Sequence, residues 1–239
     1  MLQEKLDLLN KWLSQSNNIV FFGGAGVSTE SGIPDFRSMD GLYHMKYTNP
    51  PEKILSHSFF INQTNEFYLF YKDKMIYTEA QPNITHRKLA ELEIQGKLQG
   101  IITQNIDGLH QKAGSKKVLE LHGSILRNHC MKCNKAYDLK YIIESTGIPI
   151  CSCQGIIKPD VVLYEEALED EIITETVNLI SNAEVLIIAG TSLSVYPAAG
   201  LIRYYRGDKL VLVNKAATDY DLRADLLIRE SLGQVFSGI

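Results

Sequence analysis

The stretch Asn18–Arg37, NIVFFGGAGVSTESGIPDFR, decides the fold class of this chain. It opens with a short run that is apolar on both faces, which is typical of a buried parallel strand. Glycines follow at once at Gly23, Gly24 and Gly26, and glycines let backbone N–H groups come close to a pyrophosphate. The pattern predicts a strand that runs into a nucleotide-binding loop.

The same loop departs from the usual dinucleotide-binding fingerprint. Thr29 occupies the third glycine position, and no clear acidic residue ends a second strand about 20 residues later. A tight structural turn therefore explains the glycines about as well as a nucleotide does. The residues that follow favour the nucleotide, because Phe36 offers an aromatic face beside a sugar and Arg37 a forked cation for phosphate. The alternative is a core phenylalanine beside a surface ion pair.

Short apolar runs like the first one recur along the chain, with helical stretches between them. The strand-like runs are Gly100–Thr103, Lys117–Leu121, Val185–Ala189, Lys209–Val213 and Asp225–Ile228, and the helical stretches include His86–Lys97, Glu169–Ala183 and Tyr196–Tyr205. This alternation predicts an α/β fold with an open, doubly wound parallel sheet. Two segments interrupt it: residues 39–77 are rich in tyrosine and phenylalanine, and residues 126–157 contain every cysteine. We expect both to pack on the sheet domain and to leave a ligand cleft beside it.

The composition is that of an ordinary globular protein. Of the 239 residues, 45% are hydrophobic and 22% charged, which suits one large domain, alone or with a small insertion. Lysine and arginine number 24 and aspartate and glutamate 28, so the formal net charge is 24 − 28 = −4. A mildly acidic chain without basic runs argues against nucleic acid or an anionic membrane as a partner.

The apolar runs are too short for a membrane protein. None approaches the roughly 18–20 residues that span a bilayer. The first residues, MLQEKLDLLNKWL, read as an amphipathic helix and lack the basic and apolar regions of a secretion signal. We therefore expect a cytoplasmic protein.

The four cysteines form two close pairs, Cys130 with Cys133 and Cys151 with Cys153, and 17 residues separate the pairs. In a reducing compartment, such pairs predict a tetrahedral Cys₄ zinc site with zinc–sulfur distances near ~2.3 Å. Two disulfides in a secreted domain, or a redox dithiol, are the alternatives. Four thiolates leave no open position for water, so the zinc is expected to be structural.

Polar residues follow three of the other expected strands. TQNIDGLH, Thr103–His110, offers amides for a ribose and a carboxylate for an amide N–H₂; the alternative is an Asx-type turn. GTSLSVYP, Gly190–Pro197, offers backbone N–H groups and the hydroxyls of Thr191 and Ser192 to phosphate or ribose. Asn214 follows a further strand and is suited to a ribose hydroxyl. Since the carboxyl ends of parallel strands meet at one edge of a sheet, these residues are expected to form one site.

His122 lies in LHGS, Leu121–Ser124, directly after another expected strand. Imidazole is suited to general-base catalysis at neutral pH because its reference pKa is about 6.5. A lone histidine at a strand end is more often structural than catalytic, and only its setting separates His122 from the five other histidines.

Taken together, these motifs resemble those of the sirtuins, the NAD-dependent protein lysine deacylases. The resemblance is carried by GAGVSTESGIPDFRS, TQNIDGLH, LHGS, the four cysteines, KPDVVLYEE (Lys158–Glu166), GTSLSVYP and Asn214, which occur in the family's order and cover nearly the whole chain. It implies a minimal catalytic core of bacterial type. The implied parts are a Rossmann-like NAD-binding domain of residues 1–38, 78–125 and 158–239, a helical module (39–77) and a zinc-binding module (126–157). NAD and an acyl-lysine peptide would enter the cleft between them from opposite sides.

The resemblance also assigns site residues. It places Gly24, Ala25, Gly26, Thr29, Asp35, Phe36 and Arg37 at the pyrophosphate and the reacting ribose, Gln104 at a ribose, Asn105, Ile106 and Asp107 in the nicotinamide pocket, and Gly190, Thr191, Ser192, Asn214 and Leu232 at the adenosine half. In the implied reaction nicotinamide leaves and the acyl oxygen attacks the ribose, giving an alkylimidate. His122 and Asn105 are the implied catalytic residues, with His122 as general base on a ribose hydroxyl. The products are lysine, nicotinamide and O-acyl-ADP-ribose.

For the peptide, the resemblance implies a strand within VVLYEE, Val161–Glu166, that pairs with the substrate backbone by β-addition. The residues assigned to this substrate groove are Val161, Val162, Leu163 and Tyr164, together with Tyr68 near the acyl group. The Phe-Gly-Glu ending that is commoner in the family is absent here. Family members that remove succinyl groups carry a Tyr and an Arg three apart, and here Tyr71 stands in place of the Arg. An acetyl or other neutral acyl group is therefore expected.

Two other functions would use the same motifs: a protein mono-ADP-ribosyltransferase and a non-catalytic NAD-sensing module. His122 favours deacylation, because only that reaction needs an activated ribose hydroxyl. A hydride-transferring dehydrogenase is disfavoured by the incomplete fingerprint. We expect a monomer that acts on acyl-lysine proteins or peptides and binds neither nucleic acid nor membrane.

Overall fold

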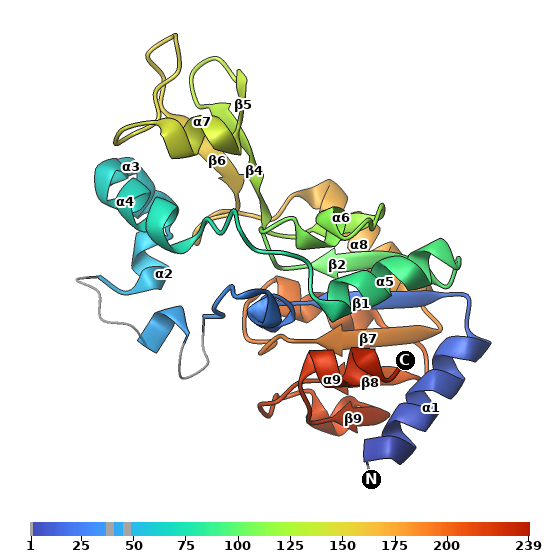
Figure 1. The fold of residues 1–239 in the computed structure, drawn as a ribbon. Coiled ribbons are helices and arrows are strands. Elements are labelled where there is room, and N and C mark those ends of the chain that lie inside the picture. The colour runs from blue at the N-terminus through green and yellow to red at the C-terminus, as the bar shows by residue number, and fades with distance from the viewer. Residues whose placement is uncertain (1, 37–40, 45–48) are drawn as a thin grey trace.

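The larger of two lobes is built on a six-stranded parallel sheet with the strand order β3-β2-β1-β7-β8-β9 (Figure 1). The computed structural model describes residues 2–36, 41–44 and 49–239. The strands are β1 (Ile19–Gly23), β2 (Leu98–Thr103), β3 (Val118–Glu120), β7 (Val185–Ala189), β8 (Leu210–Val213) and β9 (Leu226–Ile228). Each of the six strands predicted for this sheet is present within two residues of its expected ends. The doubly wound α/β fold is therefore confirmed.

Alternate residues of these strands pack against opposite layers of helices. Ile19 and Phe21 share a core with one layer, whereas Val20 and Phe22 share a core with the other. The first layer contains α1 (Leu2–Gln15), α5 (Ile84–Ile94) and α9 (Leu232–Ser237), and the second contains α8 (Asp170–Asn182) and the 3-10 helix η4 (Ala198–Tyr204). Because both faces of the sheet are covered, β1 and β7 are buried along their whole length, which explains why they carry no polar side chain.

The smaller lobe joins a three-stranded antiparallel sheet to a group of helices. The sheet order is β5-β4-β6, with β4 (Gly123–Cys130), β5 (Ala136–Asp138) and β6 (Ile157–Val161). The helices are α2 (Pro51–Ile54), α3 (His57–Asn62), α4 (Thr64–Lys74) and α7 (Leu139–Glu144). A single core that includes Phe60, Phe67 and Ile142 connects the helices to the sheet. In Figure 1 these elements lie together, away from both termini.

Short helical segments complete the described chain. They are η1 (Ala25–Val27), η2 (Thr29–Ser31), η3 (Leu42–His44), α6 (Leu109–Lys112) and η5 (Asp221–Arg223). The boundaries drawn from the sequence differ from the lobes at two strands. Both β4 and β6 lie in the small sheet, although residues 123–125 and the residues from 158 onward were assigned to the larger domain. Among the described helices, none has the length and apolar character that a membrane crossing requires.

Two buried histidines contact each other inside the larger lobe, with their ring planes tilted by 58°. His86 on α5 and His110 on α6 have ring centroids 4.7 Å apart. Within the described part of the chain, neither ring nitrogen of His110 nor Nε2 of His86 has a hydrogen-bond partner. Burial lowers the pKa of His86 to about 4 and that of His110 to about 3. Both imidazoles are therefore neutral in the folded protein at pH 7.

We expect these two histidines to make the fold sensitive to acid. Below pH about 6.5 the unfolded chain binds protons that the folded protein does not, so stability is present above that pH and is lost as pH falls toward 4. The pair steepens the fall in the free energy of unfolding by up to about 2.7 kcal/mol per pH unit. Urea unfolding at pH 7.5, 6 and 5 measures this slope. His110→Asn should reduce it by about half of that amount, and an unchanged slope would contradict the prediction.

Candidate functional site

The carboxyl ends of β1, β2, β7 and β8 meet at the edge of the sheet that faces the smaller lobe. A cavity of about 660 Å³ opens there, and Leu55 and Met75 of the smaller lobe also line it. Its volume lies within the range of ligand pockets, about 300–1,000 Å³. The predicted site residues that line it are Ala25, Gly26, Thr29, Asp35, Phe36, Gln104, Asn105, Ile106, Asp107, His122, Val161, Val162, Leu163, Tyr164, Gly190, Thr191, Ser192, Asn214 and Leu232.

Two of the described residues that were assigned to this site from the sequence do not line the cavity. Gly24 lies behind the loop, where an added Cβ would come within 2.7 Å of Thr191 Cβ, so this glycine allows the loops after β1 and β7 to touch. Tyr68 is buried in the core of the smaller lobe and its hydroxyl donates to the backbone oxygen of Ile157. The expectation that Tyr68 contacts the acyl group is not supported, because the aromatic core of α4 encloses it. Arg37 lies outside the described residues.

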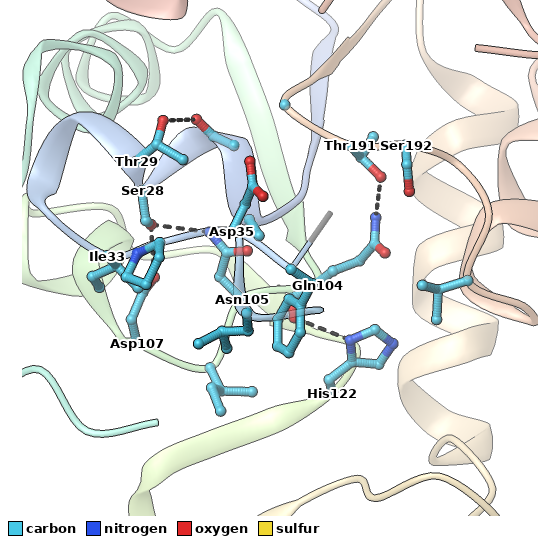
Figure 2. Close-up of a pocket in the computed structure, with 18 of the residues that line it drawn as sticks. Ser28, Thr29, Ile33, Asp35, Gln104, Asn105, Asp107, His122, Thr191 and Ser192 are labelled. Atoms are coloured by element: carbon cyan, nitrogen blue, oxygen red, sulfur yellow. Dashed lines mark hydrogen bonds between the residues drawn. The ribbon is translucent and has the colours of Figure 1, made fainter. Parts of the chain in front are cut away.

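His122 follows β3 and is partly buried. Its Nδ1 lies 3.0 Å from the backbone oxygen of Gln104, as Figure 2 shows. A carbonyl oxygen only accepts, so Nδ1 carries the hydrogen and Nε2 is left to accept a proton. Burial lowers the pKa of His122 below its ordinary value, and the hydrogen bond to Gln104 partly opposes this. The imidazole is therefore neutral at pH 7, as a general base requires.

Gln104 also connects two strand ends with its side chain. Its Nε2 donates to Thr191 Oγ1 over 3.0 Å, and the same oxygen accepts the backbone N–H of Leu193 over 3.2 Å. The residue thus joins the end of β2 to the loop after β7, while its backbone oxygen orients His122 (Figure 2).

Three polar side chains that are hydrogen-bonded to one another line the same cavity as His122. Asn105 Nδ2 donates to Ser28 Oγ over 3.1 Å, and Ser28 Oγ donates to Asp107 Oδ2 over 2.7 Å. The other carboxylate oxygen of Asp107 accepts the backbone N–H of Leu109 over 2.9 Å. Burial raises the pKa of Asp107, and these two donors oppose the rise. A carboxylate offers about four acceptor positions, so Asp107 retains capacity for an amide N–H₂ from a ligand.

Ser28 is a site residue that the sequence reasoning missed. It lies within the GVST part of the glycine loop and is 1% exposed. Its only signal in the sequence is a hydroxyl directly after the glycines, and its partners Asn105 and Asp107 lie 77 and 79 residues further along the chain.

Phe36 lies where the glycine loop meets the smaller lobe. Its ring contacts that of Tyr43 edge to face, with centroids 5.5 Å apart. The hydroxyl of Tyr43 in turn lies 2.6 Å from that of Tyr164. The aromatic side chain therefore belongs to the cavity wall, as the sequence predicted, and is only partly buried.

The far end of the cavity is shaped by the loop after β8. Asn214 Nδ2 donates to the backbone oxygen of Ala216 over 3.0 Å, and Arg229 Nη1 donates to the backbone oxygen of Asn214 over 3.0 Å. Arg229 also pairs with Asp221. Leu232 is the first residue of α9 and is buried. These contacts hold the loop in a defined shape against α9.

The strand expected over Val161–Glu166 ends early, because β6 stops at Val161. The N–H of Val162 donates to His122 O, that of Leu163 to Glu166 Oε2, and that of Tyr164 to Leu55 O. These bonds take the place of a sheet ladder and close a turn over residues 163–166. The groove residues line the cavity as a turn and not as a strand.

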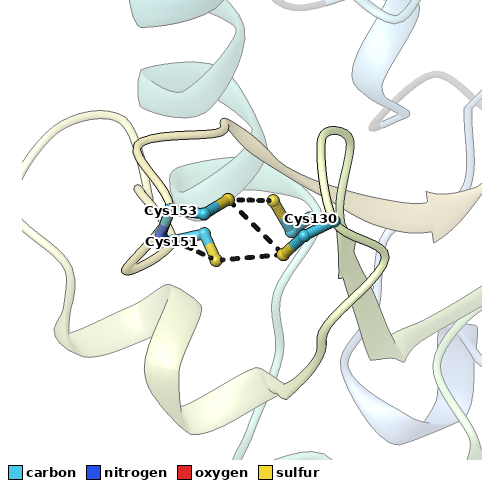
Figure 3. Close-up of side chains that lie close together, drawn as sticks. Cys130, Cys151 and Cys153 are labelled. Atoms are coloured by element: carbon cyan, nitrogen blue, oxygen red, sulfur yellow. Dashed lines mark hydrogen bonds between the residues drawn. The ribbon is translucent and has the colours of Figure 1, made fainter.

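The four cysteine sulfurs lie within 4.8 Å of one another (Figure 3). The sulfurs of Cys130 and Cys153 are 3.4 Å apart, and those of Cys133 and Cys151 are 3.6 Å apart. A tetrahedron with zinc–sulfur distances near ~2.3 Å has sulfur–sulfur edges near ~3.8 Å, whereas a disulfide is about 2.05 Å long. The cluster therefore fits a structural zinc ion held by four thiolates. The backbone N–H of Cys153 and the Tyr137 hydroxyl lower the pKa of Cys151 to about 5, which favours the thiolate.

Gly123 connects His122 to β4, the strand that ends at Cys130. Its φ is 72°, and an added Cβ would lie 1.8 Å from the backbone oxygen of Asp160 on β6. We expect Gly123→Ala to lower the free energy of unfolding by roughly 3 kcal/mol or more, since it adds a backbone clash to the cost of a left-handed conformation. Gly96→Ala is a matched control, because Gly96 has a φ of 73° with nothing within 4 Å of the added Cβ, and should cost only about 1 kcal/mol. Equal losses in the two variants, measured by chemical unfolding, would contradict this account.

Comparisons with known proteins agree on one family. The profile of the Sir2 family matches residues 24–197. A protein of Clostridium acetobutylicum named NAD-dependent protein deacetylase is 59% identical over 100% of this chain and 99% of its own. A protein of Clostridium perfringens with the same name is 57% identical, again over 100% of this chain and 99% of its own.

Solved structures of Sir2 proteins have the same fold. A complex described as Sir2 with a p53 peptide and NAD⁺ is 37% identical, with a TM-score of 0.87 over 97% of this chain and 95% of that one. A structure described as Sir2 bound to acetylated peptide is also 37% identical, with a TM-score of 0.86 over 97% of this chain and 95% of that one.

Proposed function

Because this chain belongs to the Sir2 family, we propose that it is an NAD-dependent protein-lysine deacetylase that converts acyl-lysine, NAD and water to lysine, nicotinamide and O-acyl-ADP-ribose. The observation that carries the proposal is the neutral His122, whose Nδ1–H is held by Gln104 while Nε2 is left to accept a proton. It lies in one cavity with the Asn105–Ser28–Asp107 group.

The hydrogen-bonded groups described above, together with Phe36, have the following roles in this reaction. Asp107 accepts from the nicotinamide carboxamide, and Asn105 and Ser28 hold it in place. Phe36 covers the ribose and excludes water. His122 Nε2 takes the proton of the ribose hydroxyl that attacks the imidate carbon, and the Gln104 oxygen stabilises the imidazolium that forms. The zinc would be held by Cys130, Cys133, Cys151 and Cys153 and supplies no chemical step.

The contents of the cavity favour a neutral acyl group. Lys74 and Lys215 are the lysines among the described residues that line it, and Lys74 is already paired with Asp73 over 2.9 Å. An acidic acyl group would have to displace that carboxylate. Tyr71, the residue in place of the arginine of succinyl-removing members, is buried in the small-lobe core, and its hydroxyl has no hydrogen-bond partner among the described residues. In a competition between acetyl- and succinyl-lysine peptides, we expect the acetyl peptide to be consumed first.

The test of the function is a reaction of the purified protein with NAD and an acetyl-lysine peptide. Mass spectrometry should show loss of the acetyl group, and nicotinamide should appear in equal amount. Gain of ADP-ribose on the peptide would support the mono-ADP-ribosyltransferase instead. Binding of NAD without nicotinamide release would support the NAD-sensing module. A cytoplasmic location, a monomeric state and the lack of a nucleic-acid partner stay predictions.

A further inference from the structure

Residues 161–166 form one wall of the substrate groove, and hydrogen bonds join this wall to the start of α3. Tyr164 donates its N–H to Leu55 O over 3.0 Å, and its own oxygen accepts the N–H of His57 over 2.9 Å. A parallel bridge pairs Tyr164 with Ser56. The wall therefore uses one side of its backbone to bind residues 55–57 of the smaller lobe.

Glu165 is the next residue of this wall and has an unusual conformation. Its φ is 75°, in the left-handed region where glycine is favoured and other residues are strained. Its carboxylate accepts hydrogen bonds from both the backbone N–H and the hydroxyl of Ser58. The backbone N–H of Ser58 donates to Oε2 over 2.8 Å, and its hydroxyl donates to Oε1 over 2.9 Å. Strain of this kind persists only where the surroundings hold the residue in place, and Ser58 does so here.

The backbone N–H groups of the residues before Glu165 already have hydrogen-bond partners within the protein. The N–H groups of Val162, Leu163 and Tyr164 all donate within the protein. Glu166 makes a second connection to the smaller lobe. Its Oε1 lies 2.8 Å from His57 Nδ1, and its Oε2 accepts from Lys158 Nζ over 3.1 Å. Among the described residues, the backbone N–H and oxygen of Glu165 have no hydrogen-bond partner, and Glu165 lines the cavity.

We propose that Glu165 is a positioning residue for the substrate peptide. It acts through the hydrogen bonds of its carboxylate to Ser58 at the start of α3. The carboxylate holds the wall in its left-handed turn and so keeps the backbone N–H and oxygen of Glu165 available to the main chain of an acyl-lysine peptide. Main-chain pairing supplies affinity without reading the peptide sequence. The inference rests on the proposed function and deepens it, because it identifies how the peptide side of the cavity is held.

Four variants separate the bond to Ser58 from the strain. Glu165→Ala removes the bond and keeps the strain, whereas Glu165→Gly removes both. Both variants should raise the KM for an acetyl-lysine peptide about tenfold, since hydrogen bonds to charged groups are the stronger ones. Their kcat and their KM for NAD should stay within about twofold. Glu165→Gln should restore most of the affinity, because its amide oxygen accepts the Ser58 N–H and its N–H₂ donates to the hydroxyl. Glu171→Gln removes an exposed carboxylate in the first turn of α8, which does not line the cavity, and should behave as wild type.

Binding of a fluorescein-labelled acetyl-lysine peptide, followed by anisotropy, tests the inference without catalysis. We expect the Kd to rise in parallel with KM in the Ala and Gly variants, with circular dichroism unchanged. A wild-type peptide KM and Kd in Glu165→Gly would overturn the inference. So would an equal rise in the KM for NAD, which would indicate a general structural role. If the wild type binds the peptide but releases no nicotinamide, the proposed function fails while the anisotropy measurement still decides the role of Glu165. Lack of peptide binding by the wild type would overturn the inference itself.

Discussion

Replacing His122 by alanine should lower kcat/KM for deacetylation by about 10²–10⁴-fold while NAD still binds. General-base assistance typically contributes this much, and His122 presents Nε2 for that purpose because Gln104 O holds Nδ1–H. Isothermal titration with NAD measures binding, and peptide mass spectrometry measures turnover.

Two further measurements separate catalysis from folding. In the wild type, kcat/KM should fall as pH falls through a value below 6.5, because burial lowers the pKa of His122 and only its neutral form accepts a proton. That limb of the pH profile should vanish in His122→Ala. His129→Ala is a control, since His129 pairs with Asp160 on the small sheet and does not line the cavity. Full activity of His122→Ala would remove the catalytic assignment.

Loss of one zinc ligand should unfold the smaller lobe. Cys151 is buried and lies at the closure between β4 and the turn before β6. Structural zinc contributes apparent binding free energies of about 10–16 kcal/mol to small domains, so Cys151→Ala should lose the metal and most of that stabilisation. Because β4 begins directly after His122, deacetylation should be lost as well. Metal content per chain, thermal unfolding and activity measure the three effects.

Ser152→Ala is the matched control for the zinc prediction. Ser152 lies between the two cysteines of the second pair and is exposed, so this variant should keep one zinc per chain and the wild-type melting temperature. Treatment of the wild type with a strong chelator should reproduce the Cys151→Ala result. A Cys151→Ala protein that retains its zinc and its melting temperature would contradict the prediction.

The sheet and the zinc site were predictable because their signals are local. Runs such as Val185–Ala189 carry only apolar residues, and a strand covered on both faces needs that composition. The spacing of Cys130 and Cys133 reflects the reach of two thiolates to one metal. The polar residues that follow β2, β7 and β8 were predicted to form one site for a similar reason, since parallel strands bring their carboxyl ends to one edge.

Two predictions for the substrate side of the cavity concern residues whose setting depends on distant segments. The family resemblance assigned Tyr68 to the acyl group, whereas its hydroxyl donates to the backbone oxygen of Ile157, 89 residues away. The family resemblance implied a strand within Val161–Glu166. Hydrogen bonds to Leu55, His122 and Glu166 turn the chain instead.

By itself, the sequence determined the family, the parallel sheet, the cysteine cluster and many of the residues that line the cavity. The sheet and the cysteine cluster follow from periodicity and spacing within short segments of the chain. The family and the site residues follow from the resemblance of its short motifs. Only the tertiary structure decided that Ser28 supports Asp107, that Gln104 sets the tautomer of His122, and that Glu165 binds Ser58. These contacts join segments 79, 18 and 107 residues apart, and a hydrogen bond across such a distance depends on how the lobes pack, which no local pattern encodes.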